Sequence, residues 1–240
     1  MIGDAGDRRR RYPVAVSAEA LALAWARQED APAGSVVVVD HEISPRGRLG
    51  RLWPHPAERT AVLAMVWRPA IASSAADLVW AAASLGLLRA VHSLGDGDEP
   101  ALWWPDEVHD GDGRLLGAVR AEVQLGPGRV TSAVVTGRID LDQAGGRSRE
   151  DVLVEVEGAL AAVAAVLDGD PDALRAACHE RSALAGRRAV AHLLPRGEVR
   201  GEVAGIDPDG GLVLRSATGL HQRVPIVGLD RVTRSEAGRV

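Results

Sequence analysis

The chain has 240 residues, a hydrophobic content of 46% and a mean hydropathy of -0.01, values typical of a soluble globular protein with a folded core. Its formal net charge of -5 argues against a general nucleic-acid binder, and no apolar run reaches the length of a transmembrane helix. The single cysteine, Cys178, excludes a disulfide framework and a thiolate metal site, and we expect a cytoplasmic protein.

Lysine is absent from the chain, so all 28 residues in the Lys+Arg count are arginines. Chemistry that depends on a lysine of the protein itself, such as a Schiff base or a P-loop contact, is therefore excluded. The N-terminus lacks the apolar segment of a secretory signal. The run Arg8 to Arg11 fits contact with nucleic acid or phosphate, but we predict a disordered basic tail over residues 1–12.

The first half of the chain predicts alternating strands and helices. A strand at residues 12–16 leads to a helix that runs to about Arg27, with Ser17 as its N-cap. Strands follow at 35–39 and 60–67. A helix is predicted at 74–94, where Ser74 and Asp77 resemble a capping box.

The second half predicts a hairpin turn at 109–113, strands at 115–123 and 129–141, and a helix at 148–167. Another helix begins with Pro171 at its first position. From Gly186 onward, short strands at 189–194, 201–206, 212–215 and 222–226 alternate with turns, which indicates a small β-barrel. The boundary is predicted near Leu184.

A loop rich in arginine and glycine lies between the strands at 35–39 and 60–67. It reads Pro45-Arg46-Gly47-Arg48-Leu49-Gly50-Arg51 and is followed by Trp53. Glycines let a backbone approach a ligand closely, and guanidinium groups bind phosphate or carboxylate. The spacing also fits a solvated basic turn.

The order of these segments resembles the biotin–protein ligases and their lipoate-ligase relatives. Their signature G-R-G-R-x-G-R with a Trp is similar to residues 45–53, and K-W-P-N-D is similar to Trp103-Trp104-Pro105-Asp106-Glu107. A third signature, G-R-K-L-A-G-I-L, resembles residues 113–119, and residues 200–207 resemble the SH3-like appendix of the family. The resemblance covers residues 14–234 and leaves no room for the DNA-binding helix-turn-helix of some members.

This resemblance implies an α+β fold with a biotin-synthetase-type (class II synthetase-like) mixed sheet and helices over residues 13–184. A small C-terminal SH3-like β-barrel is implied for residues 185–235. The implied reaction has two steps: the carboxylate of an acid attacks the ATP α-phosphate, and a lysine of a biotin- or lipoyl-type carrier protein then takes the acyl group. The implied ligands are ATP, Mg²⁺ and biotin or a related carboxylic acid.

The resemblance also assigns roles to residues of this chain. Arg48 and Arg114 would be catalytic, and Asp106 and Glu107 would hold Mg²⁺, which prefers oxygen ligands. Binding of the acid and the nucleotide would fall to Ser17, Glu42, Arg46, Gly47, Arg51, Trp53, Trp103, Trp104 and Gly117.

The chain departs from the family pattern at positions that carry the chemistry. Glu42 replaces a glutamine, and Arg114 replaces the catalytic lysine. Arginine keeps the charge, but its planar fork places that charge differently, and a misplacement of ~1 Å can cost roughly a hundredfold in rate. These changes predict an altered or impaired ligase. The alternatives are a non-catalytic ligand-binding or scaffold protein that keeps the fold, and acyl transfer from a preformed thioester without ATP.

Two further patterns yield weaker predictions. The apolar positions Leu78 and Leu85 are predicted to lie in the core, and a homodimer face that includes them is left open. Asp40, His41 and Glu42 are not predicted to form a metal site, because successive residues of a strand point to opposite faces.

Overall fold

The computed structural model describes residues 8–95 and 99–235 and contains two sheets. The larger sheet has seven strands in the order β1-β2-β3-β7-β6-β5-β4. Strands β1 and β2 are parallel, and the remaining neighbours are antiparallel. The α+β class with a mixed sheet, expected from the sequence, is confirmed. The strand bounds are β1 Arg9–Ala15, β2 Val36–Glu42, β3 Thr60–Trp67, β4 Ala101–Trp103, β5 Glu107–His109, β6 Leu115–Gly126 and β7 Arg129–Asp140.

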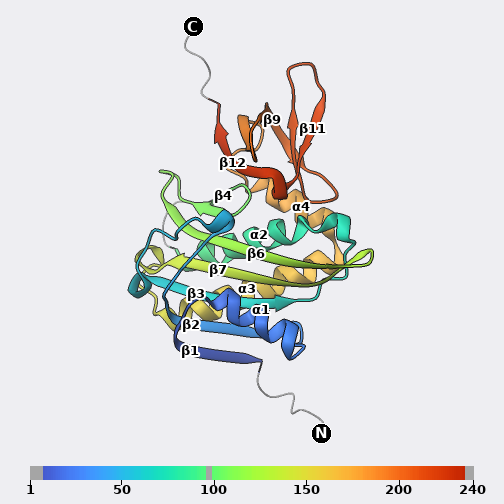
Figure 1. Ribbon diagram of the computed structural model, residues 1–240. Coiled ribbons are helices and arrows are strands. Elements are labelled where there is room, and N and C mark those ends of the chain that lie inside the picture. Colours follow the sequence, from blue (N-terminus) through green and yellow to red (C-terminus); the bar gives the residue numbers. More distant parts are fainter. Residues whose placement is uncertain (1–7, 96–98, 236–240) are drawn as a thin grey trace.

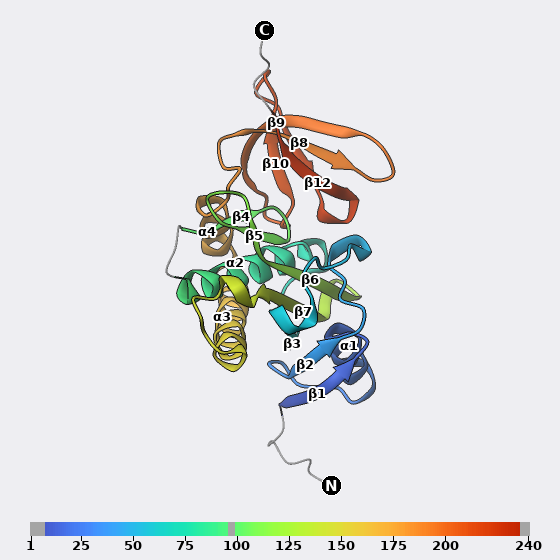
Figure 2. The same cartoon turned by 90° about the vertical axis from the view of Figure 1, so that its left-hand side faces the viewer.

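Helices cover both faces of this sheet (Figure 1, Figure 2). Helix α1 (Ala18–Gln28) packs on one face, and α2 (Leu78–Leu94) and α3 (Arg149–Gly169) pack on the other. The valines of β2 alternate between the two cores: Val37 and Val39 face α1, whereas Val36 and Val38 join the larger core. Because neighbouring strand residues point to opposite faces, a strand covered on both sides is a continuous apolar run.

The second sheet is antiparallel, has five strands in the order β11-β10-β9-β8-β12, and is called the C-terminal sheet below. Its strands are β8 Arg188–Leu193, β9 Glu198–Ile206, β10 Leu212–Arg215, β11 His221–Val224 and β12 Leu229–Arg234. It lies at one end of the molecule, next to α4 (Pro171–Glu180) (Figure 1). None of the helices in the described part of the chain has the length and hydropathy needed to span a bilayer.

The prediction of a disordered tail was wrong for residues 9–12, which belong to β1; residues 1–7 lie outside the described part. The arginines of β1 are paired with acids of neighbouring elements. Arg9 binds Glu150 and Glu157, and Arg11 binds Asp40 and Glu150. Neutralised in this way, the basic run pairs in register with β2.

The predicted capping box at Ser74 was also wrong. Helix α2 begins at Leu78, and the Asp77 side chain makes no capping hydrogen bond. Its Oδ2 instead accepts a hydrogen bond, at 2.9 Å, from the backbone N–H of Ile226, which lies between β11 and β12 of the C-terminal sheet. Leu78 and Leu85 are only 2% and 1% exposed within the core, so neither forms a homodimer face.

Candidate functional site

The arginine–glycine loop closes on itself beside the ends of β2 and β3. The Trp53 N–H donates to the Pro45 carbonyl at 3.1 Å, and the Gly47 N–H donates to the Arg51 carbonyl at 2.8 Å. The buried Trp53 ring fixes the base of the loop, because its Nε1 donates to Thr60 Oγ1 at 2.8 Å. The loop is therefore held in one defined conformation.

The three arginines of the loop are all held by oxygen atoms of the protein, and two of them share Asp230 as a partner. Arg48 is only 5% exposed; its Nη1 and Nη2 donate to the carbonyls of Leu229 and Asp230, each at 2.6 Å. Arg51 also binds Asp230, through Oδ1 at 2.6 Å. Arg46 is exposed and folds back onto the Gly50 carbonyl. The loop thus joins the larger sheet to the C-terminal sheet: Arg48 and Arg51 both donate to the Asp230 carbonyl, whereas Arg46 turns away from it.

Asp106, a predicted magnesium ligand, is buried against Arg48, with Arg48 Nε 3.0 Å from its Oδ1. Burial raises the pKa of this carboxyl even though Arg48 lowers it. The neighbouring Glu107 binds His109 Nε2 at 2.9 Å. Within the described ranges, no cluster of three or more acidic, histidine or cysteine side chains could hold a metal. Asp106 and Glu107 have separate protein partners, an arrangement that does not fit a shared Mg²⁺.

A buried ion pair lies among the residues predicted to bind the acid. Arg138, on β7, and Glu42, at the end of β2, have side chains that are 2% and 3% exposed. Arg138 Nε donates to Glu42 Oε2 at 2.9 Å, and Arg138 Nη2 donates to Oε1 at 3.1 Å. Glu42 Oε1 also accepts from the backbone N–H of Ala18, next to the N-cap Ser17, at 2.8 Å. Strands β2 and β7 and the start of α1 therefore meet at one neutralised pair.

Little free volume remains beside this pair. A space of about 10 Å³ is lined by residues that include Glu42, Pro45, Trp53 and His55, which is room for about one water molecule. Glu42 and Trp53 line this space, Ser17 precedes Ala18, whose N–H binds Glu42, and the Arg138 guanidinium group donates to both Glu42 oxygens.

A second cluster of charged residues lies on the same face of the larger sheet as the Glu42–Arg138 pair. Glu19 of α1 binds Arg120 of β6 at 2.8 Å, and Arg120 also binds Glu122 at 2.7 Å. Burial raises the pKa of Glu19. Here too, the arginine is already matched by carboxylates of the protein.

The remaining predicted residues lie away from the loop interior. Arg114 has a side chain that is 60% exposed and sits near Asp110 and Gln143. Trp103 donates from Nε1 to the Val232 carbonyl at 3.0 Å, and Trp104 is a core residue. Gly117 is a packing position, since a Cβ there would lie 2.8 Å from the Arg138 carbonyl oxygen. The structure therefore does not bring these residues together with Arg48.

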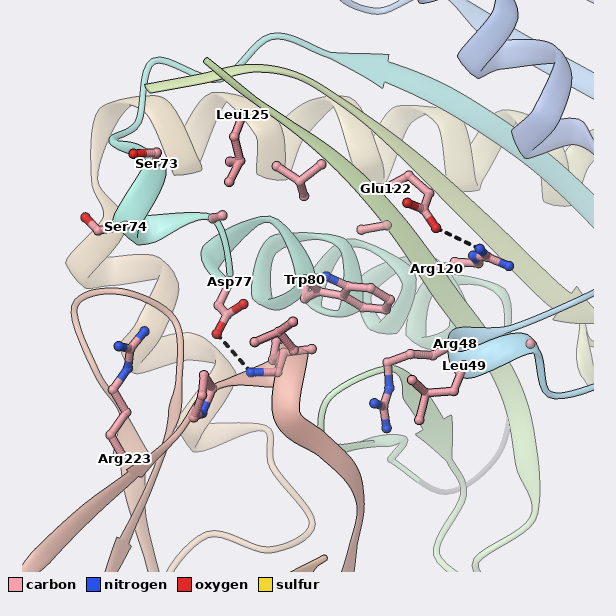
Figure 3. A pocket seen from close by; sticks show the side chains of 17 residues that line it. Arg48, Leu49, Ser73, Ser74, Asp77, Trp80, Arg120, Glu122, Leu125 and Arg223 are labelled. Atoms are coloured by element: carbon pink, nitrogen blue, oxygen red, sulfur yellow. Dashed lines mark hydrogen bonds and ion pairs between the residues drawn. The ribbon is translucent and has the colours of Figure 1, made fainter. Parts of the chain in front are cut away.

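A separate cavity of about 690 Å³ opens between the loop, β6, the start of α2 and the C-terminal sheet (Figure 3). Strand β5 pairs with β6 only as far as Ala118, so the following residues of β6 form one wall. Trp80 and Asp77 form the opposite wall, and residues 225–227 close one side. Of the residues predicted from the sequence, Arg48 lines this cavity.

The sequence reasoning missed Arg138, Arg120, Glu19 and Asp77. A signal for the first was present: Ser132, Thr136, Arg138 and Asp140 are polar residues at alternate positions of a strand that is otherwise apolar. A buried charge on such a face requires a partner of opposite sign. The position of Asp77 beside Ile226 had no local signal, because the two residues are far apart in the sequence.

Comparison with known proteins gives a consistent result. Residues 188–228 match the family model described as the biotin protein ligase C terminal domain. No curated protein matches the sequence. Among solved structures, the fold is similar to the biotin protein ligase from Aquifex aeolicus in complex with biotin and ATP, with a TM-score of 0.73, 16% identity and coverage of 95% of this chain and 99% of that chain.

Two further solved structures agree with this result. One is a biotin protein ligase-like protein of unknown function from a Silicibacter species, with a TM-score of 0.70, 16% identity and coverage of 90% and 93% of the two chains. The other is the biotin acetyl coenzyme A carboxylase synthetase from Helicobacter pylori, with a TM-score of 0.60, 14% identity and coverage of 90% and 98%. The resemblance expected from the sequence is confirmed: the chain has the fold of the biotin protein ligases and carries their C-terminal domain at residues 188–228.

Proposed function

We propose that this protein is a ligand-binding protein that keeps the biotin protein ligase fold and does not attach biotin to a carrier. The observation that carries the proposal is the buried Glu42–Arg138 pair, in which the guanidinium group donates to both Glu42 oxygens beside a space of only about 10 Å³, in the region where the acid was expected to bind. An acid entering there would have to displace a hydrogen-bonded buried pair. Removing a partner from such a pair costs about 3–5 kcal/mol.

The state of Arg48 supports the same conclusion. A guanidinium group that stabilises a developing negative charge must have donors aimed at the reacting oxygen. Arg48 instead directs Nε to Asp106 and its two Nη atoms to backbone carbonyls. Arg114, at the family's lysine position, is held by neither the loop nor the C-terminal sheet. The chain also has no lysine that could take over the role.

A second candidate function is the adenylate-forming ligase implied by the family. Its support is the fold match over 95% of the chain to a ligase in complex with biotin and ATP. In this case biotin or a related acid, ATP and Mg²⁺ would bind, and a carrier-protein lysine would receive the acyl group. The Arg48–Asp106 and Glu42–Arg138 pairs would both have to open before reaction.

Acid-dependent exchange between ATP and pyrophosphate distinguishes the two functions. We expect no exchange above background with biotin, lipoate or octanoate, while an active biotin protein ligase assayed in parallel exchanges with biotin. Exchange that depends on the acid and is lost in Arg48→Ala would establish the ligase. Labelling of a carrier by an acyl-thioester alone would instead indicate transfer of a preformed acyl group.

A further inference from the structure

The 690 Å³ cavity has a largely apolar wall that is open to solvent. Leu49, Leu125 and Val227 line it and are 50%, 60% and 84% exposed, although large aliphatic side chains of this kind are usually buried. Trp80, labelled in Figure 3, and Ile226 also line the cavity and add to its apolar surface. Concave sites with this composition bind the apolar body of a small molecule.

The arginines of the cavity are already neutralised. Arg48 faces Asp106, Arg120 faces Glu19 and Glu122, and Arg223 faces Asp207 and Asp209. Three guanidinium groups are thus matched by five carboxylates before any ligand enters. An anionic ligand would have to compete with these carboxylates for every cation on the cavity wall.

Asp77 is the exception among the charged groups. Its Oδ2 accepts from the Ile226 N–H, and no salt bridge joins its carboxylate to any residue within the described ranges. Burial raises the pKa of Asp77, because its negative charge is partly removed from water, although the Ile226 N–H and the charge of Arg223 lower it. A cation beside it would offset that cost. Trp80, from the next turn of the chain, offers an aromatic ring on the same wall, and such rings attract cations.

We propose that this cavity binds a small molecule with an apolar body and a cationic amine, with the ammonium group at Asp77 and the body against Leu125, Ile226 and Val227. The inference rests on the proposed function and deepens it. It names a ligand class for a protein that, under that proposal, keeps the ligase fold without forming an adenylate. A nucleotide triphosphate or a simple carboxylic acid has the wrong charge for this site.

Three probes with the same apolar chain test the proposal by calorimetry on the wild-type protein at pH 7: octylamine, 1-octanol and octanoate. We expect octylamine to bind at least about tenfold more tightly than 1-octanol, because its ammonium group forms an ion pair with the Asp77 carboxylate, whereas the hydroxyl group carries no charge. Octanoate should bind more weakly than either. Octanoate binding as tightly as octylamine would overturn the proposal, and this ranking needs no variant.

The variant Asp77→Asn then tests whether the ammonium group binds at Asp77. The amide still accepts a hydrogen bond from Ile226 and has nearly the same size, but it carries no charge. Octylamine affinity should fall to that of 1-octanol, while 1-octanol affinity stays unchanged. The matched control is Asp172→Asn, which removes an exposed acid on α4 and should change neither affinity. An unchanged octylamine affinity in a folded Asp77→Asn protein would contradict the assignment. Failure of the amine to bind would leave the exchange assay unaffected, so the two proposals fail separately.

Discussion

At the scale of single residues, the pairing of arginines with carboxylates decides what the protein can bind. Arg138 and Glu42 come from strands that are brought together by the sheet, and both are almost completely buried. A buried charge is tolerated only when a partner and hydrogen bonds compensate for its lost hydration. The pair therefore joins β2 to β7 in the folded protein, and under the proposed function it keeps an acid out of this region.

Arg138→Ala is expected to destabilise the protein by about 3–5 kcal/mol, because Glu42 would remain buried without its cation. The free energy of unfolding measured in urea tests this. The matched control is the double variant Glu42→Gln with Arg138→Met, in which no charge is left unpaired and the Ala18 N–H keeps an acceptor. The double variant should be more stable than Arg138→Ala. Equal losses in the two proteins would show that the charge is not responsible.

His109 provides a pH-dependent contribution. Its Nδ1 lies 3.0 Å from the Gly113 carbonyl and its Nε2 lies 2.9 Å from Glu107, and only the protonated ring donates at both nitrogens. Burial lowers the pKa of His109, but the hydrogen bonds to Glu107 and Gly113 and the negative charges of Glu107 and Asp110 raise it, and the pKa lies above its ordinary value of 6.5.

Because the pKa of His109 is higher in the folded state, the protonated ring stabilises the fold fully below pH 6.5. This contribution disappears as the pH rises through the folded-state pKa. Urea unfolding at a series of pH values should therefore show wild-type stability falling relative to His109→Gln above pH 6.5. A difference between the two proteins that stays constant or grows with pH would contradict this assignment.

At the scale of secondary-structure elements, the start of α2 forms the contact with the C-terminal sheet. Gly210, in the turn before β10, lies directly against it: a Cβ at Gly210 would be 2.3 Å from the Leu78 backbone nitrogen. Together with the Asp77 contact to Ile226, this close approach positions residues 225–227 on the cavity. The contact between the start of α2 and the C-terminal sheet therefore shapes the cavity together with the arginine–glycine loop.

Gly210→Ala is therefore expected to cost about 1–3 kcal/mol from overpacking, in addition to about 1 kcal/mol of backbone strain at its φ of +97°. Gly219→Ala is the matched control, since Gly219 has a φ of +83° and nothing within 4 Å of its Cβ position. Thermal unfolding of both variants should show the larger loss for Gly210→Ala. Equal losses of stability in the two variants would mean that only backbone strain destabilises Gly210→Ala. The contact with α2 would then accommodate the added methyl group.

At the scale of the whole molecule, the sequence could predict the fold because its signals are local and ordered. The buried strand before the loop, the capped helix at Ser148 and the short strands after Gly186 each follow from neighbouring residues. The charge pairs could not be predicted in this way. Glu42 and Arg138 are separated by 96 positions, and Arg48 and Leu229 by 181. Only the folded chain shows that the arginines of the ligase-like loop are already occupied.

Titration of biotin into the wild-type protein tests this account most directly, because it asks whether the region around the Glu42–Arg138 pair accepts the acid at all. The account predicts no saturable heat, that is, a Kd weaker than about 1 mM, for biotin alone and with ATP present. Saturable biotin binding with a Kd of about 1 µM would contradict it.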